Sequence, residues 1–363
     1  MASTLLISSG GGHLKQLFTL VPRIGIAPED QVWATFRNGL SESLLEGRRV
    51  VYVPFAAPRD VLATARIARI VGRLLDTEDI SRVISTGASP AVAALPQAAR
   101  RGLDAHYIES AARADGPSLS GRLVARFRRI HTYTQYPVWS DDRWAFRGAI
   151  FDAFEPGEAI ATPPIRRAVV SLGTQDGYGF DRLLRVLAPL LDGVEVLWQT
   201  GPQDVSPYGI EGRASVPHAE LAAAVAEADV VISHAGVGAA VTAIEAGKCP
   251  VLVPRLSRHG EHIDDHQTQI ADELTRRGLA IRADPERLDA GVLSSAAART
   301  TIAVGAPRFE LDATPARAGR RFAAGQPGVA PATSAGSAAP SMSASAGEAL
   351  PVPAIRTAAG SDG

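Results

Sequence analysis

The sequence predicts an α/β protein made of two domains, each a parallel sheet wound by helices. Short apolar runs alternate with longer segments whose apolar residues recur at helical spacing, and this alternation occurs in two successive series. A proline-rich polar segment, 154–164, separates the two series. The glycine-rich turns directly follow apolar runs, which is where ligands bind in parallel sheets.

The first series begins at the N-terminus. Segment 60–75 is a typical helix between two strands, because its apolar residues share one helical face. The expected strands of this series are 4–8, 31–34, 49–53, 82–85, 105–108 and 131–134.

The second series follows the proline-rich segment. Its expected strands are 167–171, 194–198, 214–216, 230–232, 251–253 and 279–281. We therefore divide the chain into a first domain (1–155), a linker (156–166) and a second domain (167–322). The remainder, 323–363, is rich in Ala, Ser, Pro and Gly and has too few large apolar residues to offset its ordering entropy, so a disordered tail is expected.

Composition narrows the class of protein. The chain has 363 residues and a net charge of −1. A chain without net positive charge gives no electrostatic support for nucleic-acid binding. The single cysteine, Cys249, rules out an intrachain disulfide and fits a reducing compartment. No apolar run reaches the roughly 18 residues of a membrane span, and the N-terminus is too short and uncharged for a signal peptide.

Three consecutive glycines, 10–12, follow the first expected strand. Gly11 and Gly12 let the backbone approach a ligand closely, and His13 stands at the start of the next helix. A helix N-terminus tends to lower the pKa of a histidine, which suits a general base. A tight strand–helix turn with a structural histidine is the alternative.

The second domain contains two comparable turns. One carries Gly173, Thr174 and Gln175, which offer backbone N–H groups, a hydroxyl and an amide; a simple turn is again the alternative. The other lies within 230–254, which reads as strand, turn, helix and strand. The unpaired N–H groups and the dipole at such a helix start favour an anion.

Two residues of this second unit stand out. His234 lies between the strand end and the turn, which favours a site over simple packing. Glu245 lies near the far end of the helix, where the dipole does not favour a carboxylate. We therefore expect Glu245 to have a partner, such as a sugar hydroxyl.

A polar segment, 259–267, follows the 251–253 strand. Its three histidines and three carboxylates allow a metal site, but the spacing matches no common zinc motif. Several neutral donors and acceptors, including His266 and Gln267, suit the hydroxyls of a sugar better than a metal ion.

Arginines accompany apolar residues in two parts of the first domain. Glu109 ends a strand, and the stretch 118–129 after it is basic and amphipathic. Segment 60–75 adds Arg66, Arg69 and Arg73. Such stretches can lie on an anionic membrane, whereas the alternative is ordinary surface helices.

Taken together, these motifs resemble a known family. Segments 228–236, 245–254 and 264–271 resemble the donor half of the Alg13/MurG-like enzymes of glycosyltransferase family 28. Segments 8–13, 108–113, 119–123 and 133–137 resemble the Alg14-like acceptor half. The chain is similar to a natural fusion of both halves over about residues 4–285, as in bacterial polysaccharide transferases.

The resemblance implies a GT-B fold, in which two Rossmann-like domains face each other across a cleft. It also implies a UDP-sugar donor and catalysis without metal or cofactor, because main-chain amides and the helix dipole stabilise the leaving diphosphate. On the donor side it places Gly173, Thr174, Gly236 and Val237 at the diphosphate, Val216 beside the base, Glu245 at the ribose, and His266 and Gln267 at the sugar, with Gln175 and His234 nearby. On the acceptor side it places Gly11, Gly12, His13 and Glu109.

The sequence thus predicts an inverting glycosyltransferase. It would move a hexose or N-acetylhexosamine from a UDP-sugar to a polyprenyl-diphosphate-linked saccharide in polysaccharide or glycolipid biosynthesis. His13 or Glu109 would be the base, with His13 preferred. We expect a cytoplasmic protein, peripheral at the inner face of the membrane. A soluble natural-product glycosyltransferase, a non-catalytic nucleotide-sugar-binding subunit and a nucleotide-sugar epimerase of the same fold remain alternatives.

Overall fold

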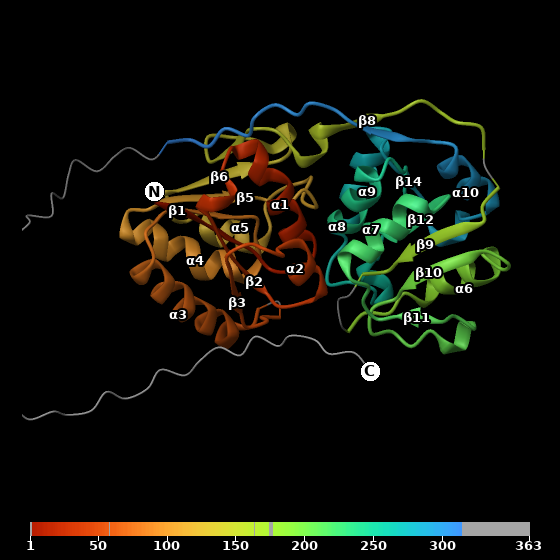
Figure 1. The fold of residues 1–363 in the computed structure, drawn as a ribbon, viewed down its shortest axis with the longest axis horizontal. Helices are drawn as coiled ribbons and strands as arrows, with labels where there is room; N and C mark the ends of the chain where they lie inside the picture. The colour runs from red at the N-terminus through yellow and green to blue at the C-terminus, as the bar shows by residue number, and fades with distance from the viewer. Residues whose placement is uncertain (1, 58, 163, 174–176, 314–363) are drawn as a thin grey trace, which may run out of the picture. The chain divides into compact units, whose positions relative to one another are not determined.

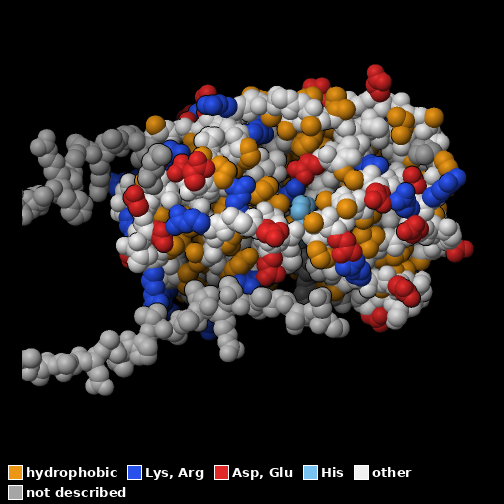
Figure 2. Space-filling view, in the orientation of Figure 1, with side chains coloured by type: hydrophobic (Ala, Val, Ile, Leu, Met, Phe, Trp, Pro, Cys, Tyr) orange, Lys and Arg blue, Asp and Glu red, His pale blue; other side chains and the backbone are white. Residues whose placement is uncertain are grey.

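The computed structural model describes residues 2–57, 59–162, 164–173 and 177–313, and these belong to one compact unit. Within this unit the chain forms two parallel α/β domains, as the sequence predicted (Figure 1). Thr174, Gln175 and the expected tail lie outside the described residues. Acidic and basic side chains are interspersed over the visible face, in keeping with the small net charge (Figure 2).

The first domain is a seven-stranded sheet with the order β3-β2-β1-β4-β5-β6-β7, and all neighbouring strands are parallel. Its strands are β1 (Ser3–Ile7), β2 (Gln31–Phe36), β3 (Val50–Val53), β4 (Ile80–Ser85), β5 (Asp104–Ile108), β6 (Ile130–Thr134) and β7 (Trp144–Phe146). Sequence analysis missed β7, because three residues are too few to show a periodic pattern.

Five α-helices connect these strands: α1 (Gly12–Ile24), α2 (Gly39–Leu44), α3 (Val61–Thr77), α4 (Ala88–Arg101) and α5 (Leu119–Val124). Helix α3 buries Ile67 and Val71 on one face, and the Asp60 side chain caps its N-terminus. The basic stretch 118–129 is helical only as far as Val124, so the expectation of one long amphipathic helix there was wrong.

The second domain is a six-stranded parallel sheet with the order β11-β10-β9-β12-β13-β14. Its strands are β9 (Arg167–Ser171), β10 (Glu195–Gln199), β11 (Gly212–Arg213), β12 (Val230–His234), β13 (Val251–Val253) and β14 (Ile281–Arg282). Its helices are α6 (Asp181–Leu190), α7 (His218–Glu227), α8 (Val237–Glu245), α9 (His266–Arg276) and α10 (Ala290–Ala297). Short 3-10 turns in the two domains are Pro28–Asp30, Pro137–Trp139, Ile150–Ala153, Ser206–Tyr208, Ser257–His259 and Pro285–Arg287.

Two strands of this sheet differ from expectation. The strand predicted at 214–216 lies at 212–213, because the Val216 N–H donates to the Gln199 side chain instead of a neighbouring strand. The strand predicted at 279–281 begins only at Ile281, because the Leu279 N–H still bonds back to Leu274 at the end of α9.

The chain passes between the domains twice. Strand β8 (Phe154–Pro156), at the expected boundary between first domain and linker, pairs antiparallel with β15 (Thr301–Ala303). Segment 304–313 then returns to the first domain (Figure 1). There Phe309 is buried against Tyr133. The sequence-based boundary at 322 had assigned this segment to the second domain; burial of Phe309 explains the difference.

Strand order reverses between β1 and β4 in the first sheet and between β9 and β12 in the second. Ligands bind beside such reversals at the carboxyl ends of parallel strands. Helices α1 and α8 leave these points and pack against each other, and one apolar cluster includes Leu14 and Leu17 of α1 with Ala240 and Ile244 of α8. Among the described helices, none is long and apolar enough to cross a membrane.

Candidate active site between the two domains

Two helix N-termini meet at the interface between the domains. A Cβ added to Gly238, in the first turn of α8, would lie 3.3 Å from Gly12 Cα at the start of α1. In the other direction, a Cβ on Gly12 would lie 3.5 Å from the Gly238 nitrogen. The absence of a side chain at Gly238 thus lets the two backbones approach closely. The unpaired N–H groups and the positive dipole ends of two helices therefore converge, which favours an anionic ligand.

His13 lies in the first turn of α1, where the sequence placed it. Its Nδ1 is 2.7 Å from the Thr86 carbonyl oxygen beyond β4, so Nδ1–H donates and Nε2 keeps its lone pair. Burial lowers the pKa of His13 to about 4; the Thr86 hydrogen bond opposes this shift, and His266 and Arg113 add to it. The imidazole is thus neutral at physiological pH and can accept a proton through Nε2.

Glu109 does not have the surroundings of a base. It is fully buried, and its Oε1 accepts hydrogen bonds from the Ser110 N–H (3.0 Å) and the Tyr107 hydroxyl (3.2 Å). Its Oε2 accepts from the N–H (2.9 Å) and hydroxyl (3.0 Å) of Ser118, and a Cβ at Gly121 would lie 2.2 Å from this oxygen. Burial raises the pKa of Glu109. The carboxylate organises the loop between β5 and α5, which corrects the expectation that Glu109 faces the acceptor.

Three predicted donor residues come together at the second strand reversal. The His234 ring, at the end of β12, lies between Gly173 after β9 and Gly236 before α8. A Cβ would lie 3.0 Å from the ring at Gly173 and 2.2 Å from it at Gly236, so both positions require glycine. Burial lowers the pKa of His234 to about 3, and the charge of Arg255 contributes to the shift. His234 is therefore a neutral group behind the turn where Val237 begins α8.

The other residues that were predicted to contact the donor lie farther apart in the second domain. Val216 is buried just before α7, and Gln267 turns its side-chain oxygen to the Arg255 N–H, 3.0 Å away. Glu245 is the last residue of the nine-residue helix α8, about 12 Å along the axis from its start. In the structure Glu245 forms an ion pair with Lys15 of α1, at 2.6 Å.

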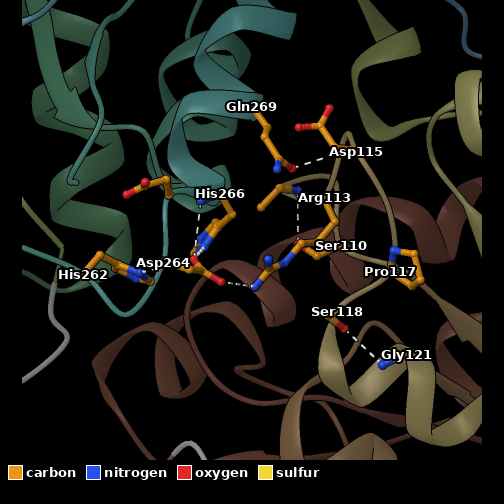
Figure 3. A network of polar contacts seen from close by, with 12 residues as sticks. Ser110, Arg113, Asp115, Pro117, Ser118, Gly121, His262, Asp264, His266 and Gln269 are labelled. Atoms are coloured by element: carbon orange, nitrogen blue, oxygen red, sulfur yellow. Dashed lines mark hydrogen bonds and ion pairs between the residues drawn. The ribbon is translucent and has the colours of Figure 1, made fainter. Parts of the chain in front are cut away.

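His266 belongs to a polar network that joins the domains (Figure 3). The Asp264 carboxylate accepts a hydrogen bond from His266 Nδ1 and forms an ion pair with Arg113 of the first domain, at 2.8 Å. The nearby imidazole of His262 and the hydrogen bond from His266 lower the pKa of Asp264. The ligand atoms of these two histidines and Asp264 lie within 4.8 Å of one another, a separation that a metal ion could bridge. The guanidinium already on the carboxylate favours a network of hydrogen bonds instead.

Sequence analysis overlooked Arg255, which is buried beside the donor turns. Its only sequence signal was its place just after the 251–253 strand, at the edge where ligands bind. Glu261, also buried, is one of the three carboxylates of the polar segment 259–267, but sequence analysis assigned it no role of its own.

Two Rossmann-like domains that meet at the carboxyl ends of their strands define the GT-B fold. Residues 169–309 match the family model of the "Glycosyltransferase family 28 C-terminal domain". This match spans most of the second domain, where the sequence motifs had indicated the same family.

Individual proteins are also similar to this chain. The UDP-N-acetylglucosamine transferase subunit ALG13 of Yarrowia lipolytica (strain CLIB 122 / E 150) is 40% identical over 68 residues, which cover 18% of this chain and 33% of that protein. The S. aureus MnaA–UDP co-structure has a TM-score of 0.52 and 10% identity, covering 85% of this chain and 93% of that one. This likeness supports the fold. MurG of Acinetobacter baumannii has a TM-score of 0.49 and 20% identity over 81% of this chain and 89% of its own.

Proposed function

We propose that this protein is an inverting glycosyltransferase that uses a UDP-sugar donor. The observation that carries the proposal is the meeting of two helix N-termini, at Gly12 and Gly238, beside the neutral His13. This arrangement supplies an anion-binding point and a proton acceptor at the boundary of a family 28 domain. The relative ALG13 is named as a subunit of a UDP-N-acetylglucosamine transferase, which supports this donor class here.

In the proposed reaction, an acceptor hydroxyl transfers its proton to Nε2 of His13. The oxygen attacks the anomeric carbon from the side opposite the diphosphate, and the bond from this carbon to the diphosphate oxygen breaks. UDP leaves with the bonding electrons, so the anomeric configuration inverts. The helix N-termini stabilise the charge on the leaving diphosphate, and we propose that no metal or other cofactor is needed. Turnover that survives metal chelation would agree with this part of the proposal.

Thermal unfolding in the presence of nucleotides tests the donor. A ligand that binds only the folded state at about 100 times its Kd adds roughly 2.7 kcal/mol of stability. We expect a selective upward shift in Tm with UDP. A shift with another nucleotide would change the donor, and no shift with any nucleotide would contradict the proposal.

Replacement of His13 by Ala tests the chemistry. Loss of the base should lower turnover about 10²–10⁴-fold while UDP binding survives. Near-normal turnover would remove His13 from the role of base. Consumption of UDP-sugar without any acceptor would instead indicate an epimerase.

We further propose that the acceptor is a lipid-linked saccharide and that the protein works at the cytoplasmic face of a membrane. Three exposed apolar residues lie before and at the start of α3: Phe55 (72% exposed), Val61 (77%) and Leu62 (75%). Exposed Arg66 and Arg69 follow on the same helix, and cations beside apolar side chains suit an anionic bilayer surface.

Sedimentation with vesicles tests this surface. We expect the protein to bind vesicles rich in phosphatidylglycerol and to bind less when Val61 and Leu62 are both replaced by Ser. Equal binding by the variant, or equal binding to neutral phosphatidylcholine vesicles, would contradict the membrane part of the proposal while leaving the donor part intact.

A further inference from the structure

Arg255 is a buried cation that holds a segment of the donor domain by its carbonyl oxygens. It follows β13 and is only 5% exposed. One terminal nitrogen donates to the Leu172 carbonyl (2.7 Å), and the other donates to the carbonyls of Tyr178 (3.1 Å), Gly179 (2.9 Å) and Glu261 (3.3 Å). A single guanidinium thus fixes the two sides of the turn that follows β9, through geometry that a lysine cannot reproduce.

The charge of Arg255 has no dedicated counterion in the part of the chain that the structure describes, where no carboxylate lies within 4.0 Å of it. The nearby carboxylate of Glu261, itself buried, accepts two hydrogen bonds from Arg182, each 3.0 Å long, and one from the Leu256 N–H. Two guanidinium groups therefore share one buried carboxylate. The second carboxylate on Arg182 is Glu286, which is largely exposed.

Burial of such a charge is unfavourable unless something compensates it. The Phe180 ring lies 4.8 Å from the guanidinium carbon and offers part of this compensation. Burial lowers the pKa of Arg255 to about 10, which still leaves the side chain protonated at neutral pH. An anionic ligand close to the site would supply the missing negative charge.

The position of this charge relative to the site follows from His234. Arg255 donates to the Leu172 carbonyl, and the next residue, Gly173, lies against the same His234 ring as Gly236. Arg255 therefore stands behind the point where Gly173 and the N-terminus of α8 come together. This is where the proposed function places the donor diphosphate.

We infer that Arg255 is a positioning residue for the donor diphosphate. Its hydrogen bonds hold Leu172 and the Tyr178–Gly179 carbonyls in place, and its only partly compensated charge favours two phosphates beside Gly173 and the N-terminus of α8. This inference rests on the proposed function, because it assumes that the anion at α8 is a nucleoside diphosphate. It goes further by assigning the discrimination between diphosphate and monophosphate to a buried side chain outside the glycine turns.

Titration calorimetry with UDP, UMP and uridine tests the inference. The variants are Arg255→Met, which removes the charge, and Arg255→Lys, which keeps it. The control is Arg276→Met, on the surface of α9, whose side chain is 70% exposed. Because attraction scales with ligand charge, we expect Arg255→Met to weaken UDP binding by roughly tenfold or more, UMP binding less, and uridine binding not at all. Arg255→Lys should restore part of the preference for UDP over UMP, and the control should match the parent.

Other outcomes distinguish a failure of this inference from a failure of the proposed donor. Equal weakening of all three ligands by Arg255→Met would mean a purely structural role and would overturn the inference. If the parent protein binds UDP no better than uridine, the proposed donor is wrong and the inference falls with it. Glu261→Gln provides a second variant, because it disturbs the same network but leaves the Arg255 charge in place. Loss of the UDP preference in Glu261→Gln, as large as in Arg255→Met, would also overturn the role of charge.

Discussion

The pKa of His13 leads to a quantitative prediction of how kcat/KM depends on pH. Below its pKa the imidazole carries a proton on Nε2 and cannot accept one from the acceptor hydroxyl. At pH 5, a histidine with the ordinary pKa of about 6.5 is only about 3% neutral, whereas one with a pKa of about 4 is about 90% neutral. The buried position of His13 therefore predicts that its contribution to kcat/KM changes little between pH 7.5 and pH 5.

The assay is the pH profile of kcat/KM, which reports groups of the free enzyme. We expect the acidic limb that belongs to His13 to lie near pH 4, and retention of most activity at pH 5. A fall of about 30-fold from pH 7.5 to pH 5, with a midpoint near 6.5, would refute the reasoning from burial. Unfolding measurements at each pH serve as the control. Because the pKa of His13 is depressed in the folded state, its contribution to stability is present above about pH 6.5 and is lost as the pH falls toward 4.

Three further predictions concern packing around the site. Gly238→Val places carbon atoms against the backbone at the start of α1 and should lower kcat/KM by about 100-fold, whereas Gly305→Val, at a glycine with open space around it, should have little effect in the same assay. Phe309→Ala should cost about 3–5 kcal/mol in urea unfolding, since Phe309 is fully buried; Ile302→Ala, at a half-exposed side chain, should cost far less, and equal losses would contradict the assigned contacts. Glu109→Gln should lower the free energy of unfolding by about 1–3 kcal/mol and leave the pH profile of kcat/KM unchanged; a displaced acidic limb would return Glu109 to the list of candidate bases.

The sequence was sufficient to predict which strand ends lie at the candidate site. Gly12 follows β1, Gly173 follows β9 and Gly236 follows β12, and the carboxyl ends of neighbouring parallel strands must lie at one edge of a sheet. Local patterns therefore fixed these positions without any knowledge of the packing between the domains.

Side-chain direction and long-range pairing could not be predicted in the same way. Glu109 also follows a strand, but its carboxylate turns inward. Ser118 donates a hydrogen bond to it there, and the missing side chain at Gly121 leaves room for it. The ion pair between Lys15 and Glu245 joins helices of different domains, and no local pattern connects such distant residues. Segment 304–313 has neither helical nor alternating periodicity, so the burial of Phe309 gave no sequence signal.

The pairing of β8 with β15 has a consequence for the integrity of the protein. Residues 158–162 are exposed and lie in the first crossing between the domains, where a protease could cut the chain. After such a cut, the β8–β15 ladder, the α1–α8 contact and Phe309 would still hold the two domains together. Because the fragments are held at several points, they separate only when all of these noncovalent contacts break together. A nicked protein should therefore dissociate slowly on dilution.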